Sequence, residues 1–103
     1  MSVMELAKAT VEDFQPLVGE SFEVALEEAA AIVTTVQLKS ATSLGQGMPG
    51  FRLPFSLMFV GPPDVYLQQQ IFWLTNPHTG TVPVFLVPVA GNSEQRTYEA
   101  VFN

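Results

Sequence analysis

The chain contains no cysteine, few cations and little charge of either sign. Without cysteine it forms no disulfide, no thiolate zinc site and no cysteine nucleophile. Only 14% of its 103 residues are charged, whereas an average soluble domain has roughly 25%. The hydrophobic content of 48% excludes a disordered chain or a coiled coil. Length and composition together predict a single domain over residues 1–103.

The cations are also too scattered for a nucleic-acid-binding protein. Four basic residues stand against ten acidic residues, which gives a net charge of −6. Lys8, Lys39, Arg52 and Arg96 are spread along the sequence, but phosphate binding needs clustered Lys and Arg. We therefore expect neither a nucleic acid nor an anionic membrane among the partners.

No segment has the pattern of a membrane span or of a signal peptide. Residues 65–93 contain no Asp, Glu, Lys or Arg, but glutamines at 68–70 and the Asn76-Pro77 pair interrupt them. A spanning helix needs about 20 nearly continuous apolar residues, so we expect no membrane span. The first six residues contain no basic patch followed by an apolar stretch. We expect no signal peptide, and synthesis in the cytoplasm.

One short helix is predicted near the N-terminus. Thr10 is a good N-cap residue, and Glu12 and Asp13 suit the positive end of a helix dipole. Pro16 and Gly19 limit the helix to about two turns. The apolar residues have helical spacing and predict one face that packs on a larger surface; they are Val11, Phe14, Leu17 and Val18.

Strand patterns dominate the rest of the sequence. Alternating or β-branched apolar residues predict strands over residues 22–27, 32–38, 51–60, 71–75, 82–87 and 97–102. Between the second and third strands, the glycines and proline of residues 40–50 predict a mobile loop. We expect a mainly β fold, either a small antiparallel barrel or a sandwich of about six strands, with one short N-terminal helix.

The last two strands have distinct edge properties. Pro83 and Pro88 cannot donate to a ladder, so the fifth strand is predicted to be an edge, or to pair on one side near its ends. The last strand, Tyr98 to Phe102, contains one acid and no proline. It either closes the barrel internally, which we favour, or adds to the sheet of a neighbouring molecule.

The sequence contains no convincing catalytic pattern. His78 is the only histidine, and we interpret it as a solvated turn residue. An active site would require it to converge with a carboxylate such as Asp64. One histidine without cysteine makes a poor metal site, and the Gly45-Gln46-Gly47 segment lacks the lysine and spacing of a phosphate loop. We expect no enzyme activity, no cofactor and no metal.

The aromatic residues are more informative about function. Phe72 and Trp73 are neighbours on a predicted strand, so their side chains face opposite ways and cannot both enter one core. One of them must face the short helix, a loop or a partner subunit, since large exposed apolar patches mark interaction sites. We predict an interaction surface that involves Phe72, Trp73, Tyr98, Val101 and Phe102.

Several segments resemble a small bacterial family described only as a domain of unknown function. The resemblance lies in residues 10–22, in the Phe55-Ser56-Leu57 and Gly61-Pro62 segments, in residues 85–89 and in the ending Tyr-Glu-Ala-Val-Phe-Asn at 98–103. It implies a small β-rich domain with no assigned activity. Members are often encoded beside proteins that resemble phage tail-collar fibres, which implies a role in assembly and assigns no site residues.

Two functional hypotheses follow. The leading one is a non-enzymatic structural or assembly protein of a fibre-like or phage-tail-like bacterial system, which binds a protein partner or itself through apolar β surfaces. The alternative is a small barrel that binds an apolar small molecule. Its pocket would be lined by Phe51, Phe55, Phe59 and Trp73 and gated by the loop from Gly45 to Gly50.

Overall fold

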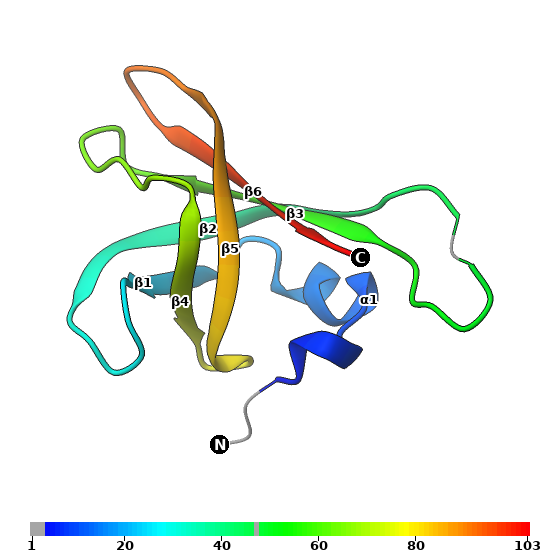
Figure 1. The fold of residues 1–103 in the computed structure, drawn as a ribbon. Helices are drawn as coiled ribbons and strands as arrows, with labels where there is room; N and C mark the ends of the chain where they lie inside the picture. The colour runs from blue at the N-terminus through cyan, green and yellow to red at the C-terminus, as the bar shows by residue number, and fades with distance from the viewer. Residues whose placement is uncertain (1–3, 47) are drawn as a thin grey trace.

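Six antiparallel strands close into a barrel, and a short helical segment packs at one end of it (Figure 1). The computed structural model describes residues 4–46 and 48–103. The helical segments are η1 (Leu6–Lys8), α1 (Val11–Phe14) and η2 (Gln15–Leu17). The strands are β1 (Ser21–Ala25), β2 (Ile32–Ser43), β3 (Phe55–Gly61), β4 (Gln70–Asn76), β5 (Gly80–Gly91) and β6 (Arg96–Phe102). The predicted mainly β fold is confirmed. Of the two predicted architectures, the strands form the barrel and not the sandwich.

The barrel consists of two meanders with the same connectivity. The spatial order is β1-β2-β3-β6-β5-β4, so β1–β3 and β4–β6 are each joined by consecutive hairpins. The two meanders meet along two antiparallel ladders, β3 with β6 and β1 with β4. The last strand therefore closes the barrel internally, as favoured from the sequence.

Each long strand is shared between two ladders. β2 pairs with β1 through residues 32–37 and with β3 through residues 37–43. Similarly, Gly80–Leu86 of β5 pairs with β4, and Val87–Gly91 pairs with β6. A register shift lies in the second ladder of each, at Leu38/Ser40 and at Pro88/Ala90. β5 is thus part of the closed wall and not an edge strand. Each half of it pairs with one neighbouring strand only, which agrees with the second alternative predicted from the sequence, pairing on one side near its ends.

Two strand boundaries differ from the sequence-based prediction. Residues 40–43 belong to β2, although we expected a loop from residue 40, because β3 supplies ladder partners for these polar positions. Conversely, the alternation predicted from Phe51 onward becomes a strand only at Phe55. Phe51 and Leu53 lie outside β3 and are exposed. Apolar alternation alone does not form a strand where no neighbouring backbone pairs with it.

The N-terminal helical segment begins and ends as its residues predict. The Thr10 amide donates to Asp13 Oδ2 at 2.9 Å, which is one half of a capping box. After η2 the chain turns at Gly19, whose φ of +98° suits glycine. Val11, Phe14 and Leu17 are buried in the core, as expected, but Val18 is 45% exposed. The helix ends too early for Val18 to share the buried face.

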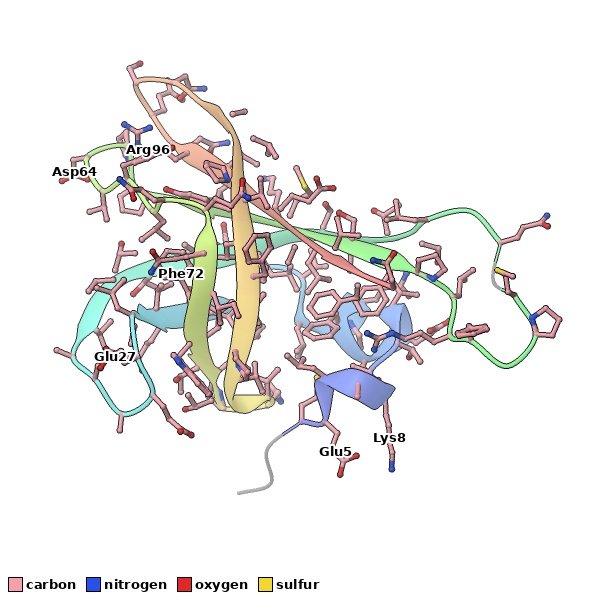
Figure 2. All side chains as sticks on the ribbon, viewed as in Figure 1. Glu5, Lys8, Glu27, Asp64, Phe72 and Arg96 are labelled. Carbon is pink, nitrogen blue, oxygen red and sulfur yellow. The ribbon has the colours of Figure 1, made fainter. Side chains whose placement is uncertain are left out.

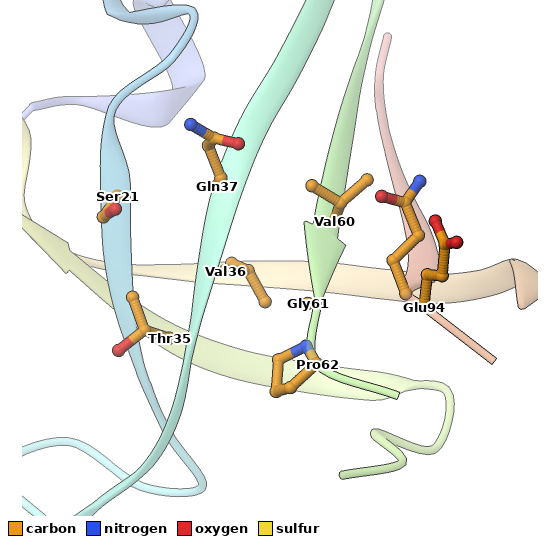
Figure 3. Close-up of a pocket in the computed structure, with 9 residues that line it drawn as sticks. Ser21, Thr35, Val36, Gln37, Val60, Gly61, Pro62 and Glu94 are labelled. Atoms are coloured by element: carbon orange, nitrogen blue, oxygen red, sulfur yellow. The ribbon is translucent and has the colours of Figure 1, made fainter. Parts of the chain in front are cut away.

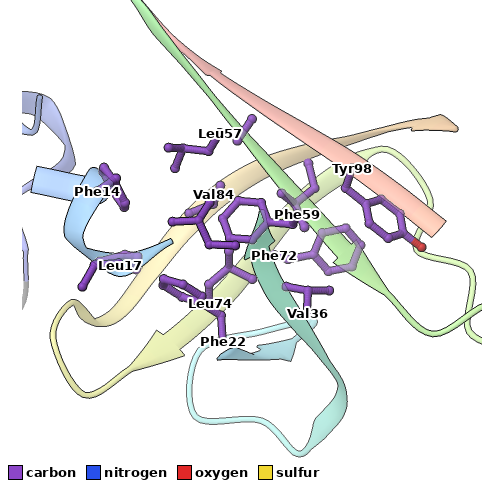
Figure 4. Close-up of a cluster of buried hydrophobic side chains, with 14 of the residues drawn as sticks. Phe14, Leu17, Phe22, Val36, Leu57, Phe59, Phe72, Leu74, Val84 and Tyr98 are labelled. Carbon is purple, nitrogen blue, oxygen red and sulfur yellow. The ribbon is translucent and has the colours of Figure 1, made fainter. Parts of the chain in front are cut away.

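Aromatic and aliphatic side chains fill the barrel interior (Figure 4). Phe22 and Phe59 meet edge to face with ring centroids 5.5 Å apart. Tyr98 is also buried, and its hydroxyl accepts a hydrogen bond from the Leu67 amide at 3.1 Å and donates to the Val65 carbonyl at 3.3 Å. These two bonds attach the loop between β3 and β4 to the core.

Candidate interaction surfaces

The structure divides the five predicted interaction residues between the core and the outer wall. Phe72 and Tyr98 are fully buried in the barrel interior, so their side chains are not part of the outer surface. Trp73 is half-buried on the outer wall, which confirms that it and Phe72 face opposite ways. Val101 is 50% exposed on β6, and Phe102 is half-buried beside the helical segment.

An apolar patch covers the outer side of the β4–β5 hairpin, and we name it the β4–β5 face. In the ladder, Ile71 lies opposite Phe85 and Trp73 lies opposite Pro83. Ile71 and Phe85 are 55% and 49% exposed, although their chain neighbours Phe72 and Val84 are buried. Two adjacent cross-strand pairs of large apolar side chains therefore face solvent together.

Only Trp73 of this face was identified from the sequence. Ile71 and Phe85 were missed because the sequence does not reveal which strands lie side by side. The available signal was that both residues alternate with buried residues in strands that are apolar on both sides. A strand that is apolar on both sides is either covered on both sides or exposes one apolar side to solvent.

Phe102 belongs to an aromatic cluster around Arg52. Its ring stacks on Phe55 at 4.8 Å and lies 6.1 Å from Phe14. The Arg52 guanidinium lies 5.6 Å from the centre of the Phe55 ring and 5.7 Å from that of Phe102. Arg52 Nη1 donates to the carbonyls of Leu6 and Ala9, and Nε donates to that of Asn103. The cluster thus joins the helical segment, the start of β3 and the end of β6.

A second exposed apolar group lies between β2 and β3, in a segment that we name the arm (residues 44–46 and 48–54). The arm extends away from the barrel, on the side opposite the β1–β2 turn (Figure 1). Phe51 is 75% exposed, and Leu44, Met48 and Leu53 are exposed as well. Phe51 and Met48 also line an open hollow of about 250 Å³ with Arg52. Gly47, part of the expected loop from Gly45 to Gly50, lies outside the described residues, as do residues 1–3 of the N-terminal segment.

The four residues of the alternative small-molecule pocket do not gather around one cavity. Phe55 and Phe59 are buried in the core, Phe51 lies on the arm and Trp73 lies on the outer wall. The barrel interior around them is occupied by their own side chains and their neighbours (Figure 4). Side-chain filling is usual for a barrel of this size.

A shallow polar groove of about 400 Å³ lies on the surface between β1, β2 and the end of β3 (Figure 3). Ser21, Thr35 and Gln37 line one side, and Gly61, Pro62 and Glu94 line the other. The groove contains one carboxylate and no histidine, lysine or arginine. It lacks a charged pair or an aromatic platform that would hold a particular ligand.

His78 and Asp64 do not form a joint site. Asp64 precedes β4 and His78 follows it, so the seven residues of β4, roughly 20 Å of strand, separate them. His78 lies in an exposed turn, where Nε2 is 3.9 Å from Glu20 Oε1 and the backbone amide donates to Asn76 Oδ1. Within residues 4–46 and 48–103, no three of the acidic and histidine side chains form a group that could hold a metal ion.

Comparisons with known proteins give the family. Over residues 4–46 and 48–103, no helix is long and apolar enough to cross a membrane. A search of curated proteins and a search of solved structures both find no match. One family model, described as "Domain of unknown function (DUF6916)", matches residues 9–102, which include the whole barrel and its capped helix. The chain belongs to this family of domains of unknown function.

Proposed function

We propose that this protein is a non-catalytic assembly module that binds protein subunits, its own copies included, through the β4–β5 face. The observation that carries the proposal is the exposure of Ile71 and Phe85, 55% and 49%, on adjacent strands beside Trp73 and Pro83. Monomeric proteins rarely leave a contiguous apolar patch uncovered, and such patches usually mark protein interaction sites.

The rigidity of the β4–β5 face also supports this function. The four side chains stand on paired strands whose inner residues, Phe72 and Val84, are fixed in the core. A surface held in this way loses little conformational entropy when a partner covers it. Aromatic residues such as Trp73 and Phe85 are typical anchors of protein interfaces.

The wider role that we propose is that of a component or helper of a fibre-like or phage-tail-like bacterial structure. The support is the resemblance described above to a small bacterial family. Members of that family are often encoded beside tail-collar-like proteins. The lack of a charged ligand site in the groove of Figure 3 favours assembly over catalysis.

The test is light scattering after size-exclusion chromatography over a wide range of protein concentrations. We expect the apparent mass of the wild-type protein to rise with concentration. The variants Ile71→Thr and Phe85→Thr keep a β-forming residue but remove apolar surface, so each is expected to weaken self-association by about tenfold or more.

Val18→Thr is the matched control, because Val18 is 45% exposed and lies outside the β4–β5 face. It should associate like the wild type. A wild-type protein that stays monomeric at all concentrations would contradict the proposal, and so would equal effects of all three substitutions.

A further inference from the structure

Carboxylates border the β4–β5 face on two sides, and the first of them belongs to Glu23 of β1. Glu23 lies opposite Thr75 in the ladder, and Thr75 is two residues from Trp73 on the same side of β4. Diagonal neighbours in an antiparallel ladder lie about 7–8 Å apart. Glu23 is exposed, so its carboxylate stands in solvent beside Trp73.

The second carboxylate belongs to Glu99 of β6, on the other side of the face. Glu99 lies opposite Val87, which is two residues from Phe85 on the same side of β5. Ser56 Oγ donates to Glu99 Oε2 at 2.7 Å, and this bond holds the carboxylate on the wall. Glu99 is half-buried, and a charge in such a position gains more from a cation than a charge in open solvent. We name Glu23 and Glu99 the border carboxylates.

The cations of the chain lie away from this face. The Lys and Arg residues all lie outside β4 and β5; they are Lys8, Lys39, Arg52 and Arg96. Figure 2 shows Lys8 on the helical segment and Arg96 toward the opposite end of the molecule. Arg96 is on β6, but its side chain donates to the Pro63 carbonyl and lies over the Tyr66 ring. Within residues 4–46 and 48–103, neither border carboxylate has a Lys or Arg partner.

The turn between β4 and β5 adds no net positive charge. It contains His78, whose Nε2 lies 3.9 Å from Glu20 Oε1. A protonated His78 is balanced by this carboxylate, and a neutral His78 leaves the carboxylate in excess. The surroundings of the face are therefore negative on the sides of β1 and β6 and at most neutral at the turn.

A partner of ordinary size covers both border carboxylates. A standard protein interface takes about 800 Å² from each partner, which is a patch roughly 28 Å across. The strands β1, β4, β5 and β6 are neighbours in that order, and at about 4.8 Å per spacing they span roughly 14 Å. Glu23 and Glu99 therefore lie within the covered area, around the apolar centre of the face.

From this charge distribution we infer that the β4–β5 face binds a different protein, whose contact surface has an apolar centre and Lys or Arg residues at its rim. Complementary rim charges accelerate association and exclude wrong partners. A second copy can stack its own face on this one, but it brings carboxylates against carboxylates, which weakens that contact. The inference rests on the proposed function and specifies the partner of the same surface.

The chain itself can be given the complementary rim, and this variant is the probe. A variant with both Glu23→Lys and Glu99→Lys, the border variant, keeps the apolar centre and has a basic border. In sedimentation velocity, we expect the wild type to bind the border variant about tenfold or more tightly than it binds itself. Sodium chloride should weaken this mixed complex and strengthen self-association of the wild type, because salt screens attraction in the first and repulsion in the second.

Two controls separate the border from net charge and from other surfaces. A variant with both Glu12→Lys and Glu94→Lys changes the net charge equally, at exposed positions on α1 and between β5 and β6. It should bind the wild type much less tightly than the border variant does. Phe85→Thr in the wild-type partner should weaken the mixed complex by about tenfold or more, because the contact loses an aromatic anchor of the face.

The outcomes separate this inference from the proposed function. If the wild type binds itself as tightly as it binds the border variant, the inference is wrong, but the proposed function stands. If the net-charge control binds as tightly as the border variant, the border does not select the partner and the inference is also wrong. If neither the wild type nor any mixture associates, both proposals fail. Circular dichroism melts show whether the variants fold, and Glu23→Lys alone gives the same test with a smaller expected gain if Glu99→Lys unfolds the protein.

Discussion

Tyr98 combines two roles at one buried position of β6. Its ring is part of the barrel core, and its hydroxyl serves the backbone of the preceding loop at Leu67 and Val65. The Leu67 amide donates its hydrogen to this hydroxyl within the protein interior. A buried amide without an acceptor costs more free energy than an exposed one, which can bond to water. The Tyr98 hydroxyl therefore contributes to the free energy of unfolding as the acceptor of this amide.

We expect Tyr98→Phe to lower the free energy of unfolding by about 1–3 kcal/mol, because the Leu67 amide loses its acceptor. Urea denaturation followed by Trp73 fluorescence would measure the change. Tyr66→Phe is the control, since Tyr66 is 54% exposed and its ring stays available to Arg96. It should change stability by less than about 0.5 kcal/mol. Equal effects of the two substitutions would show that the buried hydroxyl has no special role.

At the residue level, the sequence predicted that Phe72 and Trp73 face opposite ways, and this is confirmed. It did not predict which of them is buried. Alternation in a strand has a period of two residues, but the choice of the inner side depends on the strands that it meets. For the same reason, Tyr98 could not be recognised as a core residue before the position of β6 was known.

Arg52 joins three elements that are far apart in the sequence. Arg52 lies shortly before β3. Its side chain donates to the carbonyls of Leu6 and Ala9 in the helical segment and to that of Asn103, which follows β6. Its guanidinium also contacts the rings of Phe55 and Phe102. These hydrogen bonds add to the burial of Val11, Phe14 and Leu17, which packs the helical segment on the core.

We expect Arg52→Ala to loosen the helical segment without opening the barrel. Hydrogen exchange measured by mass spectrometry should accelerate in residues 4–17, because local opening there no longer breaks the bonds to Arg52. Exchange in β4 and β5 should remain unchanged. Arg96→Ala is the control, since Arg96 donates a single bond to the Pro63 carbonyl at another site. A uniform increase over the whole chain would contradict a local role of Arg52.

At the level of elements, the sequence predicted the number of strands and most of their positions. It failed where an element depends on its neighbours, as at residues 40–43, which pair with β3. The 3-10 helix η1 was missed because three residues carry no periodic signal. The β4–β5 face was only partly predicted, because it is made by register between two strands.

Charge repulsion acts on the molecule as a whole. The net charge is −6, and within residues 4–46 and 48–103 the close Lys–carboxylate pair, Glu5–Lys8, is exposed. Exposed pairs contribute little to stability, so salt has few favourable contacts to screen. Salt should instead screen the repulsion among the acidic residues.

We therefore expect sodium chloride to raise the melting temperature of the dilute protein. A gain of about 0.5 kcal/mol corresponds to an increase of roughly 2–4 °C for a domain of this size. Calorimetry at low and high salt would measure it. A variant with both Glu27→Gln and Glu28→Gln has two fewer negative charges and should gain less from salt. A melting temperature that falls with salt would mean that attractive contacts dominate.

The closing ladder between β3 and β6 has a consequence for synthesis on the ribosome. β3 leaves the exit tunnel well before its partner β6, because the whole β4–β5 hairpin lies between them in the chain. During that interval β3 can pair with β2 on one side, but the edge that later pairs with β6 has no partner. An unpaired strand edge is prone to pairing with other chains, so the barrel becomes protected only when β6 has been released.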